Sequence, residues 1–281
     1  MLDVAGMMLL LFVAAVAAGM LGSLVGLGGG VLIVPLLTLG FGLDIRLAVG
    51  ASIVCVIATS SGAGAALTRD RLTNVRIATV LQVATSIGAI AGALIAPHVA
   101  TKVLFLLFGG ILIFSIVPML RKRQQDVPYG LVSDELALRL GLPGLYPGGP
   151  NGTLIPYAVV RVPAGFAMMI VAGVVSGLLG IGSGALKVLA MDTAMHLPIK
   201  VSSATSNFMI GVTAAASAGI YFWRGEVLPL VAAPIAIGVL AGSIVGARML
   251  VKYRSSTIRT VFIVLLFGVA TQMLLRGLGV I

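Results

Sequence analysis

The chain has 281 residues, of which 59% are hydrophobic and 9% are charged, and its mean hydropathy is +1.18. These values exclude a soluble domain of this length and indicate a polytopic membrane protein, whose surroundings are the lipid bilayer. The formal net charge of +10 does not indicate nucleic-acid binding, because basic residues in a membrane chain fix its orientation and contact anionic headgroups.

A membrane-spanning helix needs about 20 apolar residues. Eight stretches are of this order: 4–25, 48–67, 77–97, 103–120, 164–180, 201–222, 228–249 and 258–276. Two shorter apolar stretches, 31–41 and 185–195, directly follow glycine clusters and are too short to cross as ordinary helices. The chain begins without the basic region and cleavage site of a secretory signal, so we expect 4–25 to be a retained membrane segment.

The sequence repeats itself without gaps at an offset of 154 residues. The matched pairs include Gly26 with Gly180, Gly28 with Gly182, Gly30 with Gly184, Ser52 with Ser206, Thr59 with Thr213 and Gly88 with Gly242. Glycine-rich helices can resemble one another by chance, but one constant register through glycine, serine and threonine positions indicates an internal duplication. We therefore expect a first membrane repeat over 1–122, a cytoplasmic linker over 123–162 and a second membrane repeat over 163–281.

Basic residues decide how the two copies are oriented. If the short segment after each glycine cluster counts as a membrane segment, each copy has about five segments. Because this number is odd, the two copies are inverted relative to each other. The cytoplasmic side then carries Arg69, Arg71, Arg76, Arg121, Lys122, Arg123, Lys200, Lys252, Arg254 and Arg259. The outward side carries only Arg46, Lys102, Arg224 and Arg276. The positive-inside rule therefore favours an all-α membrane protein of two inverted repeats, with both termini outside.

The linker is the only long polar stretch. Ser133 is expected to cap a short amphipathic helix, with Asp134 and Glu135 in its first turn. The proline and glycine content of residues 141–152 is expected to preclude regular structure, and Asn151-Gly152 suits a tight turn. We favour a cytoplasmic connection between the repeats over a functional site here.

The glycine clusters are unsuited to lipid-facing helices, because exposed backbone groups in hydrocarbon each cost several kcal/mol. A half-helix that starts just after the glycines, at Val31 or Ala185, directs free N–H groups and its positive dipole end at the break. Such a break can bind an anion, whereas close helix packing is the alternative for a single cluster. Inverted repeats place two breaks face to face near the midplane. The predicted backbone contributors are Gly28, Gly29, Gly30, Gly182, Ser183 and Gly184.

Polar side chains near the breaks extend the predicted anion site. Lys187 comes at the start of the second half-helix, where an intramembrane cation either lines a site or extends to the headgroups. Ile33 stands at the matching position of the first copy. Hydroxyl and amide donors follow each break, although any single serine can instead bond between helices or to its own helix. The predicted donors are Ser52, Thr205, Ser206 and Asn207, with Ser202 and Ser203 in the same cluster and Gln82 as a weaker member.

The paired stretches "GMLGSLVGLGGGVLIVPLL" and "GVVSGLLGIGSGALKV", followed by helices that open with "GAS" and "ATSNF", resemble the TauE/SafE sulfite exporter family. The resemblance covers residues 10–118 and 160–276. It implies transport of sulfite or organosulfur anions such as sulfoacetate across a bacterial cytoplasmic membrane, coupled to an ion gradient. The second copy departs from the pattern by "GIGSG" in place of a third consecutive glycine, and the proline-rich connector matches nothing in it.

We therefore expect a secondary transporter of small sulfur-containing anions in the prokaryotic cell membrane, working by alternating access. A passive anion channel, or a transporter of another small carboxylate or oxyanion, is the alternative. The coupling ion is expected to be a proton or sodium. Asp192, the one clearly intramembrane carboxylate, either carries a coupling proton or hydrogen-bonds near a helix end.

Neither an enzymatic activity nor a cofactor is expected. An enzyme would need several acid, base or nucleophile groups within the membrane, and Asp192 is the only clearly intramembrane carboxylate of the sequence. His98 and His196 lie at segment ends rather than together. Ser183 in "GIGSG" is reminiscent of an intramembrane serine protease, but the spacing differs and a partner histidine is lacking on a later helix. The sequence has no metal-ligand cluster.

Overall fold

The computed structural model describes residues 4–25, 30–69, 72–120, 132–147, 153–250 and 255–280. The first half contains α1 (Val4–Val25), α2 (Gly30–Pro35), the π-helix η1 (Leu36–Gly40), α3 (Ile45–Arg69), α4 (Val75–Ile95), the 3₁₀ helix η2 (Ala96–His98) and α5 (Thr101–Leu120). The connector contains α6 (Glu135–Arg139), β1 (Gly144–Pro147) and β2 (Leu154–Tyr157). The second half contains α7 (Val162–Leu179), α8 (Gly184–Leu189), the π-helix η4 (Ala190–Ala194), α9 (Ile199–Trp223), α10 (Pro229–Leu250) and α11 (Ser255–Leu278).

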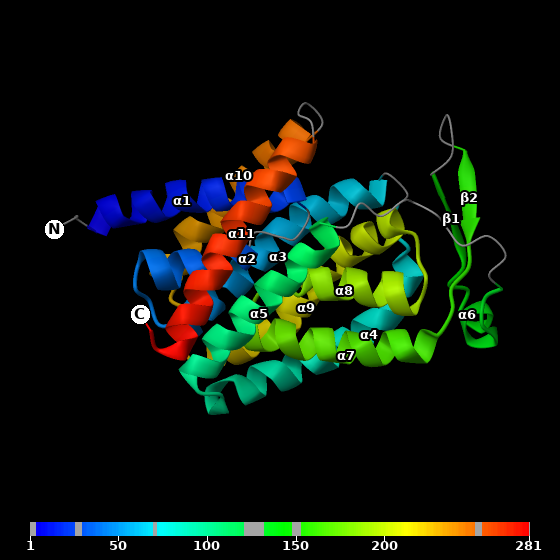
Figure 1. Cartoon of the computed structure of the whole chain (residues 1–281), viewed down its shortest axis with the longest axis horizontal. Helices are drawn as coiled ribbons and strands as arrows, with labels where there is room; N and C mark the ends of the chain where they lie inside the picture. The colour runs from blue at the N-terminus through cyan, green and yellow to red at the C-terminus, as the bar shows by residue number, and fades with distance from the viewer. Residues whose placement is uncertain are drawn as a thin grey trace.

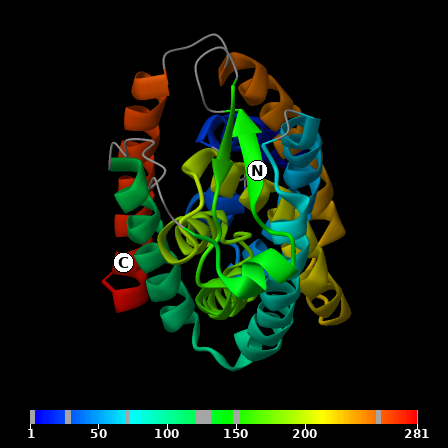
Figure 2. The same ribbon diagram turned by 90° about the vertical axis from the view of Figure 1, so that its right-hand side faces the viewer.

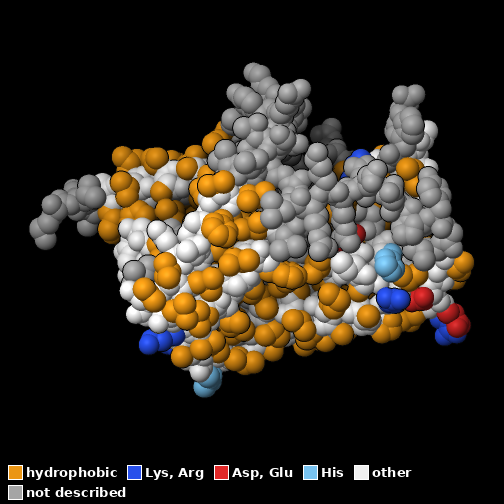
Figure 3. Space-filling model, viewed as in Figure 1, with side chains coloured by type: hydrophobic (Ala, Val, Ile, Leu, Met, Phe, Trp, Pro, Cys, Tyr) orange, Lys and Arg blue, Asp and Glu red, His pale blue; other side chains and the backbone are white. Residues whose placement is uncertain are grey.

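All eight long apolar stretches predicted from the sequence lie on helices, so the all-α class is confirmed. By length and composition, Val75–His98 and Val162–Leu179 are apolar enough to cross a membrane, and shorter apolar stretches lie in six further helical segments. Large apolar side chains such as Leu94, Val171 and Ile237 are exposed on the helix sides. Figure 3 shows hydrophobic side chains along the described face, with most charged side chains toward its two ends. Exposed apolar surface of this kind suits contact with lipid.

The helices of the two halves interleave into one body (Figure 1). α3 and α9 pack antiparallel at the centre, since Gly50 near the start of α3 meets Glu226 just beyond α9. Around them α1 packs against α10, α4 against α7 and α5 against α11. Every one of these pairs joins one half to the other, so neither half forms a separate domain.

Small residues allow the closest helix pairs to form. A Cβ atom on Gly88 of α4 would lie 2.2 Å from the Ile170 oxygen of α7. A Cβ atom on Gly242 of α10 would lie 2.0 Å from the Val16 oxygen of α1. These two contacts occupy corresponding positions at the offset of 154 residues found in the sequence.

The same offset separates the boundaries of corresponding helices. α3 and α9 begin and end 154 residues apart, as do η1 and η4, and α2 and α8 begin at that spacing. Each half-helix begins one residue earlier than predicted, at Gly30 and Gly184, and continues as a π-helix. Corresponding segments of the two halves therefore adopt the same local structure, including an uncommon π-helix.

The connector has more regular structure than predicted. β1 and β2 form an antiparallel ribbon in which Gly144 pairs with Tyr157, so the expectation that proline and glycine preclude regular structure over 141–152 is wrong. Both strands are edges of this small sheet. Proline has no N–H to donate to a strand ladder, and an edge strand tolerates this loss. Asn151-Gly152 lies outside the described residues.

The predicted cap of the connector helix is also wrong. Asp134, not Ser133, is the N-cap residue of α6. The Ser133 hydroxyl instead accepts a hydrogen bond of 3.1 Å from the Val159 N–H, and the Asp134 carboxylate accepts one from the Arg161 N–H. Both side chains thus connect the start of α6 to the segment that leads into α7. Within the described residues, neither side chain is shown bonding to the first backbone N–H groups of α6.

The connector packs on one end of the helical body, facing the viewer in Figure 2. Its Leu142, Tyr157 and Val159 share a hydrophobic cluster with Met191 and Met195 of the second broken segment. A small polar network at Asn74 adds to this contact. Asn74 Nδ2 donates to Leu142 O at 2.9 Å and to the Tyr157 hydroxyl at 2.7 Å. The stretch that the sequence marks as a linker is therefore part of the packed structure.

Candidate functional site

Ser52 of α3 brings the two broken segments together. Its Oγ lies 3.1 Å from the Gly30 oxygen, at the start of α2, and 2.9 Å from the Gly180 oxygen, just past α7. One hydroxyl hydrogen serves these two carbonyl groups, which therefore lie close to each other. Of the predicted backbone contributors in the first copy, Gly30 is at this meeting point, and Gly28 and Gly29 lie outside the described residues.

Ser206 of α9 repeats half of this arrangement in the second copy. Its Oγ donates a hydrogen bond of 3.0 Å to the Gly184 oxygen at the start of α8. Ser52 and Ser206 are matched residues, as are Gly30 and Gly184. In each half, a buried serine of the following long helix thus holds the first residue of the half-helix.

The second break is a tight turn of left-handed residues. Gly180, Gly182 and Ser183 have φ angles of 65°, 72° and 47°. At Gly182 a Cβ atom would also lie 2.7 Å from Ile210 Cγ2, so glycine meets both requirements there. The Ser183 hydroxyl is buried and has no hydrogen-bond partner among the described residues. A buried donor without a partner is available to a ligand.

Lys187 is the most unusual side chain of the site. It is 0% exposed, and its Nζ donates a hydrogen bond of 2.7 Å to Thr213 Oγ1 of α9. Thr213 is the only partner of this amine within the described part of the chain. Because the side chain is enclosed by protein, it does not extend to the surface as the headgroup alternative requires.

Thr213 connects Lys187 to polar groups of α4. Its hydroxyl lies 3.4 Å from Thr85 Oγ1 and 3.1 Å from the Gln82 amide, and it donates to its own helix at Met209 O at 2.8 Å. The sequence marked Gln82 as a weak member and passed over Thr85 and Thr213. The sequence could have indicated Thr213 as a site residue. It lies seven residues, two helical turns, after Ser206 and is therefore on the same face of α9.

The described polar partners near Lys187 are uncharged. No carboxylate pairs with it in the described residues, and an ammonium group enclosed without a counter-ion is expensive. Its partner Thr213 contacts Thr85 and Gln82, and hydroxyl and amide groups of this kind can donate to an anion without adding charge. A small anion beside Lys187 would supply the missing partner.

The remaining predicted residues have mixed surroundings. The Thr205 hydroxyl accepts the Asn74 N–H at 3.1 Å, so this side chain positions the α3–α4 loop. Asn207 is half-buried on α9, and Asp192 is half-buried in η4. Beyond the predicted donors, three hydroxyls further along α3, those of Thr59, Ser60 and Ser61, bond to carbonyls of their own helix, as isolated helix hydroxyls commonly do. No three His, Cys, Asp or Glu residues come together as metal ligands in the residues that the structure covers.

Comparisons with known proteins match the chain to one family model and to a relative in Bacillus subtilis. The family model described as "Sulfite exporter TauE/SafE" matches residues 11–273, a range that includes both broken segments and the connector. The chain is 26% identical over 278 residues to the "Probable membrane transporter protein YunE" of Bacillus subtilis (strain 168). That alignment covers 96% of this chain and 98% of the relative. No solved structure matches the chain significantly.

Proposed function

The chain belongs to the sulfite exporter TauE/SafE family and is a multi-pass membrane transporter, and from this premise we propose that it carries small sulfur-containing anions. The proposed substrates are sulfite or an organosulfonate such as sulfoacetate, moved across the cytoplasmic membrane by alternating access. Sulfite is the anion in the description of the family, and both candidates present the oxyanion groups that hydroxyl and amide donors bind.

The enclosed side chain of Lys187, which has no carboxylate partner among the described residues, carries this proposal. The substrate anion would lie beside Lys187 and draw further donors from Ser183 and from the half-buried Asn207. Ser52 and Ser206 would hold the half-helices that frame the site, since each is bonded to a half-helix start. The glycines of both breaks would let the anion approach the main chain.

Alternating access would arise from the two halves acting as inverted repeats. Three observations support this arrangement. Corresponding helices begin 154 residues apart, α3 packs antiparallel to α9, and the other main helix pairs each join one half to the other. The charges support termini outside, because Arg76 lies at the connector end whereas Arg46 and Arg224 bond to the α4–α5 region at the opposite end.

A gradient of protons or sodium would drive the transport. Asp192 is the proposed coupling group, since it is a carboxylate on the same broken segment as Lys187 and lies five residues away in sequence. A carboxylate within a membrane segment is costly and is commonly functional.

The test is uptake of labelled sulfite or sulfoacetate into proteoliposomes with imposed gradients. Accumulation above the external concentration, driven by a proton or sodium gradient, is the expected result. Flux that stays strictly downhill and ignores both gradients would contradict the transporter mechanism and indicate an anion channel. Accumulation of a carboxylate in preference to both sulfur anions would contradict the proposed substrate class.

A further inference from the structure

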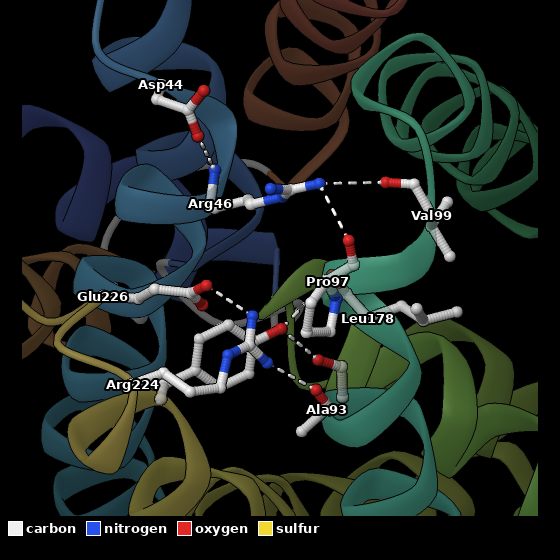
Figure 4. Close-up of polar contacts among 10 residues, drawn as sticks. Asp44, Arg46, Ala93, Pro97, Val99, Leu178, Arg224 and Glu226 are labelled. Carbon is white, nitrogen blue, oxygen red and sulfur yellow. Dashed lines mark hydrogen bonds and ion pairs between the residues drawn. The ribbon is translucent and has the colours of Figure 1, made fainter.

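Two arginines and a glutamate come together where α3 begins and α9 ends (Figure 4). Arg46 Nη2, at the start of α3, donates to Pro97 O at 3.1 Å and to Val99 O at 3.2 Å. Arg224, just past α9, donates to Ala93 O of α4 at 2.7 Å and forms an ion pair with Glu226. We call Arg46, Arg224 and Glu226 the arginine cluster.

The arginine cluster has unused hydrogen-bonding groups. Arg46 Nε and Glu226 Oε2 are both buried and have no partner among the described residues. Asp44 accepts the backbone N–H of Arg46 at 2.8 Å, while the Arg46 guanidinium has only carbonyl oxygens as described partners. The one described ion pair of the cluster is that of Arg224 with Glu226, and the Arg46 guanidinium has no described carboxylate partner, which leaves positive charge available to an anion.

The arginine cluster is linked to the second glycine break through Tyr221. Arg224 lies over the Tyr221 ring at 5.3 Å, and the Tyr221 hydroxyl donates to Gly177 O at 2.6 Å. Gly177 is three residues before Gly180, whose oxygen accepts from Ser52. These contacts connect Arg224 to the end of α7, next to the break where the anion is proposed to bind.

We propose that Arg46 and Arg224 form a second anion-binding site, through which the transported anion passes between the medium and the glycine breaks. In the absence of an anion the Glu226 carboxylate occupies Arg224, and an arriving sulfonate or sulfite group displaces it. The role in the transport path rests on the proposed function, whereas the presence of the site does not. Glu226 is suited to this exchange, because a carboxylate and a sulfonate present similar oxygen acceptors to a guanidinium fork.

Tryptophan fluorescence provides a local readout of this site. Trp223 is the single tryptophan of the chain, directly precedes Arg224 and is 87% exposed. The probe is sulfoacetate, titrated into the purified full-length protein in nanodiscs. We expect saturable quenching or enhancement in the wild type. Glu226→Gln keeps the shape but removes the competing charge, so its half-saturating concentration should fall by about tenfold.

Matched variants separate this site from the site at Lys187. Arg224→Gln should lose the fluorescence response, whereas Lys187→Met should keep it. Glu135→Gln is the control for the charge change, because Glu135 pairs with Arg139 on the surface and its loss should leave the titration unchanged. Glu226→Asp retains a shorter carboxylate and should bind with an affinity between those of the wild type and Glu226→Gln, which provides the test if Glu226→Gln does not fold.

A wild-type response in Arg224→Gln would overturn the second site. An unchanged half-saturating concentration in both Glu226 variants would overturn it as well. Loss of the response in Lys187→Met would also contradict it, because the signal would then belong to the first site. Absence of gradient-driven accumulation in proteoliposomes would contradict the proposed function alone, since the fluorescence titration needs no transport.

Discussion

Replacing Thr213 by valine keeps the shape of the side chain and removes the hydroxyl that Lys187 uses. The Thr213 side chain is 0% exposed, and its hydroxyl accepts the 2.7 Å bond from Lys187 Nζ. Hydrogen bonds to charged groups contribute about 1.5–3 kcal/mol to stability, whereas neutral ones contribute about 1 kcal/mol. The substitution leaves the buried Lys187 amine without its one described partner, so the loss should be at the upper part of this range.

Thr59→Val is the matched control. Thr59 occupies the corresponding position in the first half and is 4% exposed. Its hydroxyl bonds only to carbonyls of its own helix, at 3.0 Å and 3.2 Å, and Ile33 stands where the second half has Lys187. Both variants lose a bond to their own helix, and only Thr213→Val also loses the contacts with Lys187, Gln82 and Thr85. The difference between them therefore measures this polar network, in which the bond from the Lys187 amine is the charged member.

The assay is thermal unfolding of both variants and the wild type in one detergent at one scan rate. For chains of 150–250 residues, 1 kcal/mol shifts Tm by about 2–4 °C. We expect Thr213→Val to lower Tm by about 3–10 °C and Thr59→Val by about 1–3 °C. Equal shifts in the two variants, or the larger shift in Thr59→Val, would refute the account of Lys187.

Three further outcomes are expected. Asn207→Ala should weaken stabilisation by sulfite or sulfoacetate without loss of folded protein, and an unchanged thermal-shift titration would count against its contact with the anion. Gly242→Ala should destabilise by about 1–3 kcal/mol, because its Cβ meets the α1 backbone at 2.0 Å, whereas Gly268→Ala, with nothing within 4 Å, should leave Tm unchanged. Asn74→Ala should speed amide exchange in the connector while that of α11 stays the same, and equal exchange throughout would show that Asn74 does not hold the connector.

The pH dependence of the connector contact provides another test. Burial raises the pKa of Tyr157, although the hydrogen bond from Asn74 opposes the shift. A raised pKa in the folded state stabilises the protein below the ordinary tyrosine range, and this contribution is lost as the pH rises above it. Connector protection should therefore decrease at strongly alkaline pH in the wild type and less steeply in Tyr157→Phe. Identical profiles would exclude Tyr157 as the titrating group.

The long helices were predictable because their apolar runs match the length that a bilayer requires. The repeat register also anticipated where matching segments begin, since α3 and α9 start at the same offset as their glycine clusters. The connector was harder to predict. Proline and glycine argue against strands in general, but a two-stranded ribbon has only edges. Its Tyr146 and Tyr157 also share a hydrophobic cluster with Met191 and Met195, which lie far along the chain.

Part of the candidate site was readable and part was not. Lys187 was identified because a lysine within a membrane segment is costly and is commonly functional. Its burial was undecided from the sequence, since snorkelling and site lining use the same residue. Thr213 was passed over because threonines within helices usually bond to their own backbone, and only the packing of α8 against α9 gives this one a second role.

The most direct test of the central claim is equilibrium binding of labelled sulfite or sulfoacetate to Lys187→Met, with Lys200→Met as the matched control. Lys200 is an exposed lysine at the start of α9 and has no part in the proposed site. The account predicts that binding at the glycine breaks falls at least about tenfold in Lys187→Met, as expected when a buried charge partner is removed, while binding at the arginine cluster persists. Both are retained in Lys200→Met. Wild-type stoichiometry and affinity in a folded Lys187→Met protein would contradict it.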